Sequence, residues 1–106
     1  MSNNFDEKSL TIANNSLTDV YTASNKSMVV TGTIANKHTS SLNVTLKKYD
    51  SSGTATFVKF QDVSVPSGSA LTIPKIVLNS SDKVQVQSSH ASGLIDISLE
   101  LLTDVS

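Results

Sequence analysis

The sequence predicts an all-β domain, an antiparallel β-sandwich of the jelly-roll or immunoglobulin-like type with about seven or eight short strands. The first reason is composition, since Ser, Val, Thr and Leu dominate while Glu occurs twice and Arg is absent. The second is the alternation of apolar and polar residues, and the third is the regular spacing of turn residues. At 106 residues the chain has the length of one domain.

The strands follow from period-two alternation along the chain. Residues 95–101 alternate apolar and polar side chains without interruption, which is typical of a half-buried strand and not of a helix. Shorter alternating runs predict the other strands. In chain order, we expect strands at residues 10–13, 20–22, 28–34, 42–46, 54–60, 62–65, 71–78, 84–86 and 95–101.

Turn residues separate these runs. Residues 50–53, 66–69 and 90–93 combine Ser, Asp, Pro or Gly, and Gly53 could take a positive φ in a hairpin. Gly32 lies inside a strand, where a bulge or a close backbone approach is the usual reason for glycine. Pro74 indicates an edge strand or a bend, because a central strand would lose a hydrogen bond there.

Composition also excludes several classes of protein. Eight Lys face nine acidic residues for a net charge of −1, and without Arg or aromatic platforms we expect no nucleic-acid binding. The absence of Cys excludes disulfides and thiolate chemistry. No apolar run approaches the ~20 residues of a membrane span, so we expect no membrane contact. The polar start of the chain does not resemble a signal peptide, which favours synthesis in a cytoplasm without export.

No motif in the sequence supports catalysis or ligand binding. His38 and His90 lie in predicted turns without the spacing of a metal site, and we interpret them as exposed loop residues. Asp96 and Glu100 share one face of the last predicted strand, but about 13 Å would separate them, too far for a glycosidase pair. No nucleophile motif surrounds any serine. We therefore expect no enzyme, no cofactor and no metal.

The polar segment at residues 1–9 precedes the first expected strand, and we interpret it as a docking arm in front of a single sandwich domain at residues 10–106. Phe5 is the large apolar residue of this arm and would anchor it in a neighbour's groove. The loops at residues 37–41 and 90–93 are expected as outer tips. The predicted partner-binding residues are Met1, Ser2, Asn3, Asn4, Phe5 and Asp6.

Three stretches of the chain, residues 21–36, 71–86 and 95–101, together resemble small structural proteins from the virions of tailed bacteriophages. In that family a Tyr-Thr pair, a short loop, an apolar strand and Ala-Asn are followed by Val-Leu, a turn, Asp-x-Val-x-Val and a terminal strand. The resemblance spans residues 17–102. The chain departs from the family pattern at residues 24–26, where a Pro and a Gly are frequent.

The resemblance implies a non-enzymatic β-sandwich subunit of a phage particle, made in the host cytoplasm and located in the virion. The first hypothesis is a capsid decoration (cement) protein that binds the major capsid protein, with a homotrimer favoured among homo-oligomers. A neck or tail ring subunit is the second hypothesis. A free carbohydrate-binding module is the third, although the few aromatic residues are scattered.

Overall fold

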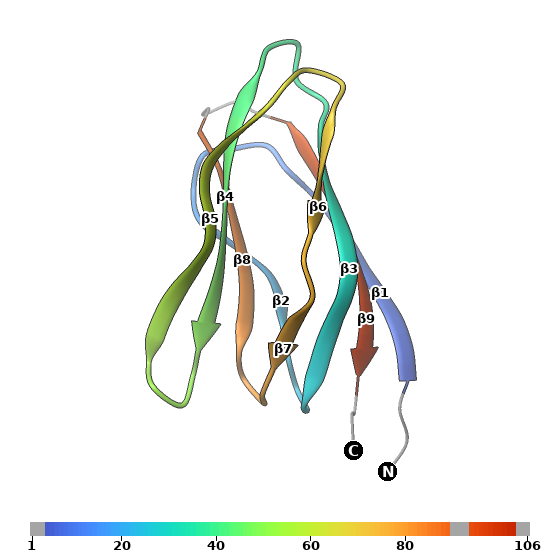
Figure 1. The fold of residues 1–106 in the computed structure, drawn as a ribbon, viewed down its shortest axis with the longest axis vertical. Helices are drawn as coiled ribbons and strands as arrows, with labels where there is room; N and C mark the ends of the chain where they lie inside the picture. Colours follow the sequence, from blue (N-terminus) through green and yellow to red (C-terminus); the bar gives the residue numbers. More distant parts are fainter. Residues whose placement is uncertain (1–3, 90–93, 104–106) are drawn as a thin grey trace.

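A computed structural model describes residues 4–89 and 94–103 of the chain, with only the backbone of Asn4. Within these residues nine strands form two antiparallel sheets, and there is no helix (Figure 1). This confirms the all-β prediction. The strands are β1 (Asn4–Ile12), β2 (Thr18–Thr22), β3 (Ser27–Asn36), β4 (Leu42–Asp50), β5 (Ala55–Val65), β6 (Ala70–Ile73), β7 (Ile76–Leu78), β8 (Lys83–Ser88) and β9 (Ile95–Thr103).

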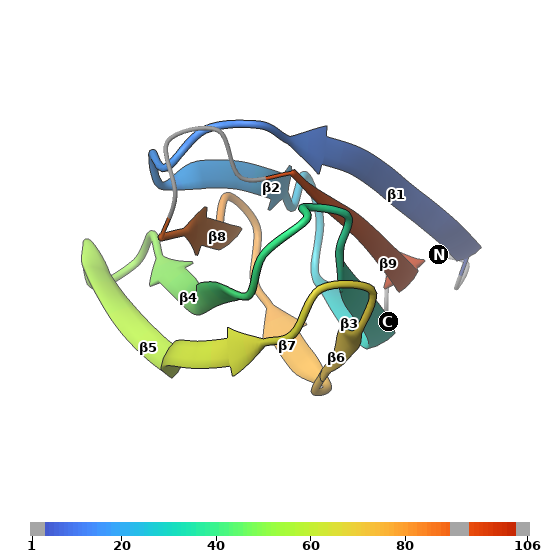
Figure 2. The ribbon, with the colours of Figure 1, turned by 90° about the horizontal axis from the view of Figure 1, so that it is seen from above.

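The order of the strands is that of a jelly roll. The first sheet has the order β1-β9-β3-β6, with β7 also paired to β3, and the second has the order β2-β8-β4-β5. Pro74 separates β6 from β7 on the same edge of β3, so the two form one interrupted strand. Counted in this way, each sheet has four strands and the sandwich has eight, as in jelly rolls. Figure 2 shows β9, β3 and β6 on one side of the core and β8, β4 and β5 on the other.

The core lies between the sheets and follows the alternation of the sequence. In β9 every second residue is buried, while the residues between them face outward. The same alternation fills the inner face of β8 and most of β3 and β4. The largest fully buried side chains are Ile34, Leu42, Leu46, Ile73, Ile76, Leu78, Ile95, Ile97, Leu99, Leu101, Val20 and Val29.

Two strand predictions were wrong. The first strand begins at Asn4 and not at residue 10, because residues 4–9 pair with β9 from Thr103 to Ser98. The strands expected at 54–60 and 62–65 form the single strand β5, in which Asp62 has a φ of 51° and the pairing with β4 shifts register. A bulge of this kind keeps a strand continuous while it bends.

The glycine and proline predictions are partly confirmed. A Cβ on Gly32 would lie 2.7 Å from the carbonyl oxygen of Ser98, so the predicted close backbone approach is present. The interruption at Pro74 lies on an edge of the first sheet, as expected. The prediction for Gly53 was wrong, because Thr54, with a φ of 48°, takes the positive φ in that turn.

Candidate interaction surface

The described residues hold no group of three or more His, Cys, Asp or Glu placed to bind a metal ion, and no helix there is long and apolar enough to cross a membrane. His38 belongs to a turn, where its Nδ1 accepts a hydrogen bond from Ser40 N at 3.2 Å and its carbonyl accepts one from Ser67 Oγ at 2.6 Å. These bonds support a structural role for His38. His90 lies outside the described residues.

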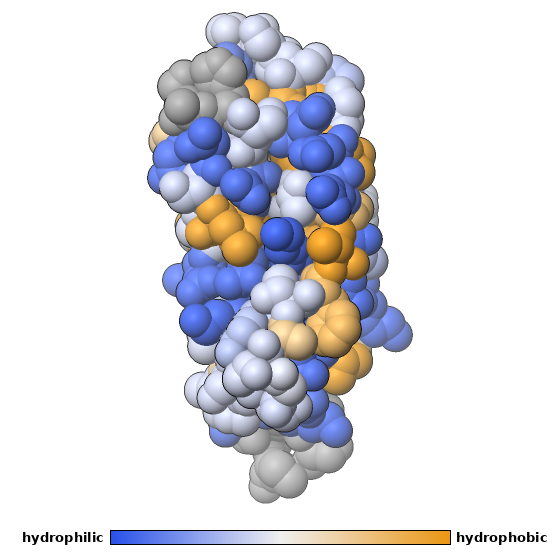
Figure 3. All heavy atoms as spheres, turned by 90° about the vertical axis from the view of Figure 1, so that its left-hand side faces the viewer, coloured by the Kyte–Doolittle hydropathy of each residue, from blue (hydrophilic) through white to orange (hydrophobic). Residues whose placement is uncertain are grey.

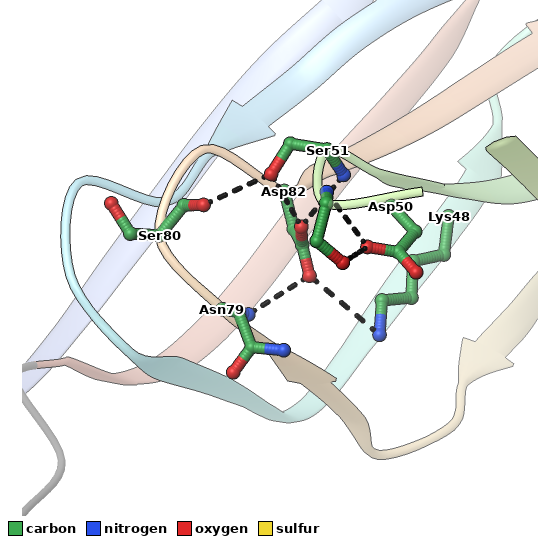
Figure 4. Close-up of polar contacts among 7 residues, drawn as sticks. Lys48, Asp50, Ser51, Asn79, Ser80 and Asp82 are labelled. Carbon is green, nitrogen blue, oxygen red and sulfur yellow. Dashed lines mark hydrogen bonds and ion pairs between the residues drawn. The ribbon is translucent and has the colours of Figure 1, made fainter. Parts of the chain in front are cut away.

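Among the residues that the structure describes, the carboxylate of Asp82 is the most deeply buried ionisable group, and it connects two loops (Figure 4). Its Oδ1 accepts hydrogen bonds from Ser51 N and Ser51 Oγ, both at 3.0 Å, and its Oδ2 accepts one from Asn79 N at 2.9 Å. Lys48 Nζ lies 3.8 Å from Oδ2. Burial alone would raise the pKa of Asp82, but the hydrogen bonds from Ser51 and Asn79 and the Lys48 charge lower it below its ordinary value. Both oxygens are occupied, which indicates a structural role.

The outer face of the first sheet carries a row of apolar side chains that crosses four strands. Phe5 of β1 pairs with Leu102 of β9, Leu102 pairs with Met28 of β3, and Met28 pairs with Val77 of β7. Residues directly opposite each other in a sheet project from the same face. Phe5 is 85% exposed and Val77 50% exposed, and the other two are half-buried. We call these four residues the apolar row.

Farther along the strands the same outer face becomes polar. The next pair is Glu7 opposite Glu100, both exposed. Beyond it lies a line of hydroxyl side chains, and beyond that Asp96, whose pKa is lowered by the hydrogen bond from Thr11 Oγ1 at 2.6 Å and by Lys37 Nζ at 3.3 Å. The hydroxyl line consists of Ser9, Ser98, Thr33 and Thr72. The large apolar side chains of this face are therefore confined to one end, and only Ala35 and Ala70 lie at the other.

An open cleft of about 600 Å³ lies beside Phe5. Val30, which sits where the pairing of β3 with β9 shifts register, is 44% exposed and contributes an apolar wall. The residues that line the cleft are Phe5, Asp6, Glu7, Val30, Glu100 and Leu101. The cleft thus combines apolar surface with three carboxylates.

The predicted partner-binding residues have different positions in the structure. Met1, Ser2 and Asn3 lie outside the described residues, and Asn4 and Asp6 belong to β1. Asp6 Oδ1 accepts a hydrogen bond from Glu7 N at 2.8 Å. Phe5 lies in the apolar row, so its neighbours on the face are residues of this chain's own sheet. The docking role of this segment stays a prediction.

Sequence analysis missed the other three members of the apolar row. One signal was present: Asp96, Ser98 and Glu100 form the polar face of β9, and Leu102 continues that face with an apolar side chain. Met28 and Val77 gave no such signal, because only the pairing of β3 with β9 and β7 places them beside Leu102. The strand register therefore creates the row.

The second sheet also exposes apolar side chains. Figure 3 looks onto the β5 side, where a strip of apolar atoms lies among polar ones. Phe57 and Val58 of β5 are 54% and 49% exposed, but they are consecutive residues of a strand and project from opposite faces. The loop at residues 37–41 lies at the end of the sandwich opposite the start of β1 (Figure 1). The predicted tip at residues 90–93 lies outside the described residues.

Neither a protein-family model nor a curated protein sequence matches this chain. Solved structures match its fold. The acidic stable capsid structure of Helicobacter pylori bacteriophage KHP30 aligns with a TM-score of 0.68 at 14% identity over 96% of this chain and 89% of that one. A Bacillus endospore appendage, from a family of disulfide-linked pili, aligns with a TM-score of 0.59 at 14% identity over 100% and 93% of the two chains. The Drosophila NLP core, described for pentamer formation and histone binding, aligns with a TM-score of 0.59 at 13% identity over 96% and 100%. At these identities the likeness establishes the fold alone.

Proposed function

We propose that this protein is a non-enzymatic structural subunit of a phage virion, and that it acts as a capsid decoration (cement) protein. The observation that carries the proposal is the apolar row, in which four apolar side chains from four neighbouring strands form one continuous surface with Phe5 85% exposed. The likeness of its fold to a phage capsid protein, and the resemblance of its sequence to phage virion proteins, indicate the kind of particle.

The proposed mechanism is the burial of the apolar row against the major capsid protein. Burying a Phe side chain contributes about 1.5–3 kcal/mol, and Phe5 is free to supply most of that because it is 85% exposed. A contact of this size is weak for one copy. Many copies on one particle, each bridging neighbouring capsid subunits, add up to a shell that resists internal pressure.

The orientation of the subunit follows from the position of the row. The row lies where β1 begins and β9 ends, while the loop at residues 37–41 lies at the other end (Figure 1). Docking through the row would therefore leave that loop pointing away from the capsid, as an outer tip. We expect the subunits to associate as homo-oligomers, with a trimer favoured.

The test is co-sedimentation of the purified protein with phage particles that lack it. Wild type should bind in hundreds of copies per particle, counted by quantitative mass spectrometry, and should increase survival of osmotic shock. Phe5→Ser should lose binding, while Phe57→Ser, which changes an exposed Phe on β5, should bind normally. A stoichiometry near a dozen would identify a neck or tail ring subunit instead. Absence of wild-type binding would contradict the proposal.

A further inference from the structure

We infer that the partner segment bound by the apolar row presents an apolar side chain next to a Lys or Arg side chain. This inference rests on the proposed function, because it names the chemistry of the partner at the same surface. The apolar row supplies the contact area, and the carboxylates beside it determine which segments fit.

The first argument is the pairing of Glu7 with Glu100. The two residues lie directly opposite each other on β1 and β9, and both are exposed. Like charges in such a pair destabilise a sheet. The described residues contain three ion pairs, Lys37–Asp96, Lys48–Asp82 and Lys83–Asp19, and neither Glu takes part in one. A cation from outside the chain would relieve this repulsion.

The second argument is the position of the charges relative to the apolar surface. Glu7 and Glu100 line the same cleft as Phe5 and Val30. Lys8, the nearest cation in the sequence, follows Glu7 on β1 and so projects from the opposite face of the sheet. An apolar side chain that packs between Phe5 and Val30 would therefore place a neighbouring Lys or Arg against two carboxylates.

The same charges argue against a second copy of this chain as the occupant. A two-fold contact uses the same surface on both subunits, so row against row would bring four carboxylates of Glu7 and Glu100 into one interface. Unpaired charges in an interface oppose association. The occupant is therefore a segment of a different protein, which under the proposed function is the major capsid protein.

The experiment uses two variants of equal net charge. Glu7→Gln with Glu100→Gln removes two of the three carboxylate charges that line the cleft and leaves Asp6, and Asp50→Asn with Asp62→Asn removes two charges elsewhere on the surface. The probes are two blocked hexapeptides, one with Leu between two Arg and one with Gln in place of each Arg. Binding is followed by NMR amide shifts at low salt.

We expect the Arg peptide to shift the amides of Glu7, Val30 and Glu100 and the Gln peptide to bind about five- to tenfold more weakly. One exposed ion pair changes affinity by up to about fivefold, and the cleft variant loses two of them. Its affinity for the Arg peptide should therefore fall about five- to tenfold, and that of the control variant less than twofold. Higher ionic strength should weaken the binding of wild type more than that of the cleft variant, which keeps only the Asp6 carboxylate in the cleft.

Equal binding of both peptides, or an unchanged affinity of the cleft variant, would overturn the inference. Self-association that depends on Phe5, seen by sedimentation equilibrium, would also overturn it, because the occupant would then be a second copy. The test of the proposed function and the test of the partner chemistry can fail independently. Particles that bind the Phe5→Ser variant as well as wild type contradict the proposed function, whereas the peptide results test the partner chemistry independently.

Discussion

Removing the carboxylate of Asp82 tests whether one buried side chain holds the end of the sandwich together. In Asp82→Ala the backbone N–H groups of Ser51 and Asn79 lose their acceptor. An unsatisfied buried donor costs about 1–3 kcal/mol. Both donors lie in loops that water can enter, so the lower half of that range applies to each, and the expected loss is about 3 kcal/mol. A domain of 106 residues has a total stability of about 5–15 kcal/mol.

The assay is urea unfolding followed by circular dichroism, since the chain has no Trp to report on unfolding. With a slope of about 1.5 kcal/mol per molar urea, the midpoint should fall by about 2 M. Asp96→Ala is the matched control, because that carboxylate also accepts a hydrogen bond and pairs with a lysine but lies at the surface. The control should shift the midpoint much less.

The stability that Asp82 contributes should decrease at acidic pH. The pKa of Asp82 is lowered in the folded protein, so the stability it contributes is present above its unfolded pKa of about 3.9 and is lost as pH falls through the folded value. The difference in unfolding free energy between wild type and Asp82→Asn should therefore shrink between pH 7 and pH 3. A loss below about 0.5 kcal/mol for Asp82→Ala at pH 7, within the range of an ordinary surface substitution, would refute the reasoning.

Three further substitutions test the packing and the surface. Gly32→Ala places a methyl group 2.7 Å from the Ser98 carbonyl oxygen and should cost about 1–3 kcal/mol in urea unfolding, and an unchanged midpoint would contradict the close approach. Asn36→Ala removes a buried amide that donates to the Val65 carbonyl at 2.9 Å and should cost about 2 kcal/mol, measured in the same way. Phe5→Ser should leave the thermal midpoint within about 2 °C, because an exposed side chain contributes little to folding. A larger decrease would mean that Phe5 belongs to the core.

The alternation of residues 95–101 predicted β9 well because its inner positions meet the core and its outer positions meet water. The same rule failed for the first half of β1. There Asp6 and Lys8 occupy the inner positions but stay exposed, so the segment shows no contrast between faces. Backbone pairing with β9 holds these residues in the sheet. Alternation of apolar and polar residues indicates which face of a strand is buried. It therefore misses a strand that is paired in a sheet while both of its faces stay exposed to solvent.

Of the apolar row, only Phe5 could be predicted from the sequence. Phe5 stood out in the sequence as a large apolar side chain among polar neighbours. Met28 and Val77 reach the same surface through the register of three strands that are distant in the sequence. The two loops that donate hydrogen bonds to Asp82 are likewise distant in sequence, since Ser51 and Asn79 belong to different turns. Contacts of this kind depend on the assembled topology, which alternation within one strand does not encode.

The break at Pro74 has a consequence for how this protein can be produced in quantity. A continuous outer strand offers a ladder of free amide and carbonyl groups on which further chains can grow. Here Pro74 lacks an N–H and divides that ladder into two short pieces, β6 and β7. On the opposite border of the same sheet, Asp6 and Lys8 place charges where a stacking neighbour would have to bury them. Both borders of this sheet therefore discourage open-ended polymerisation through it.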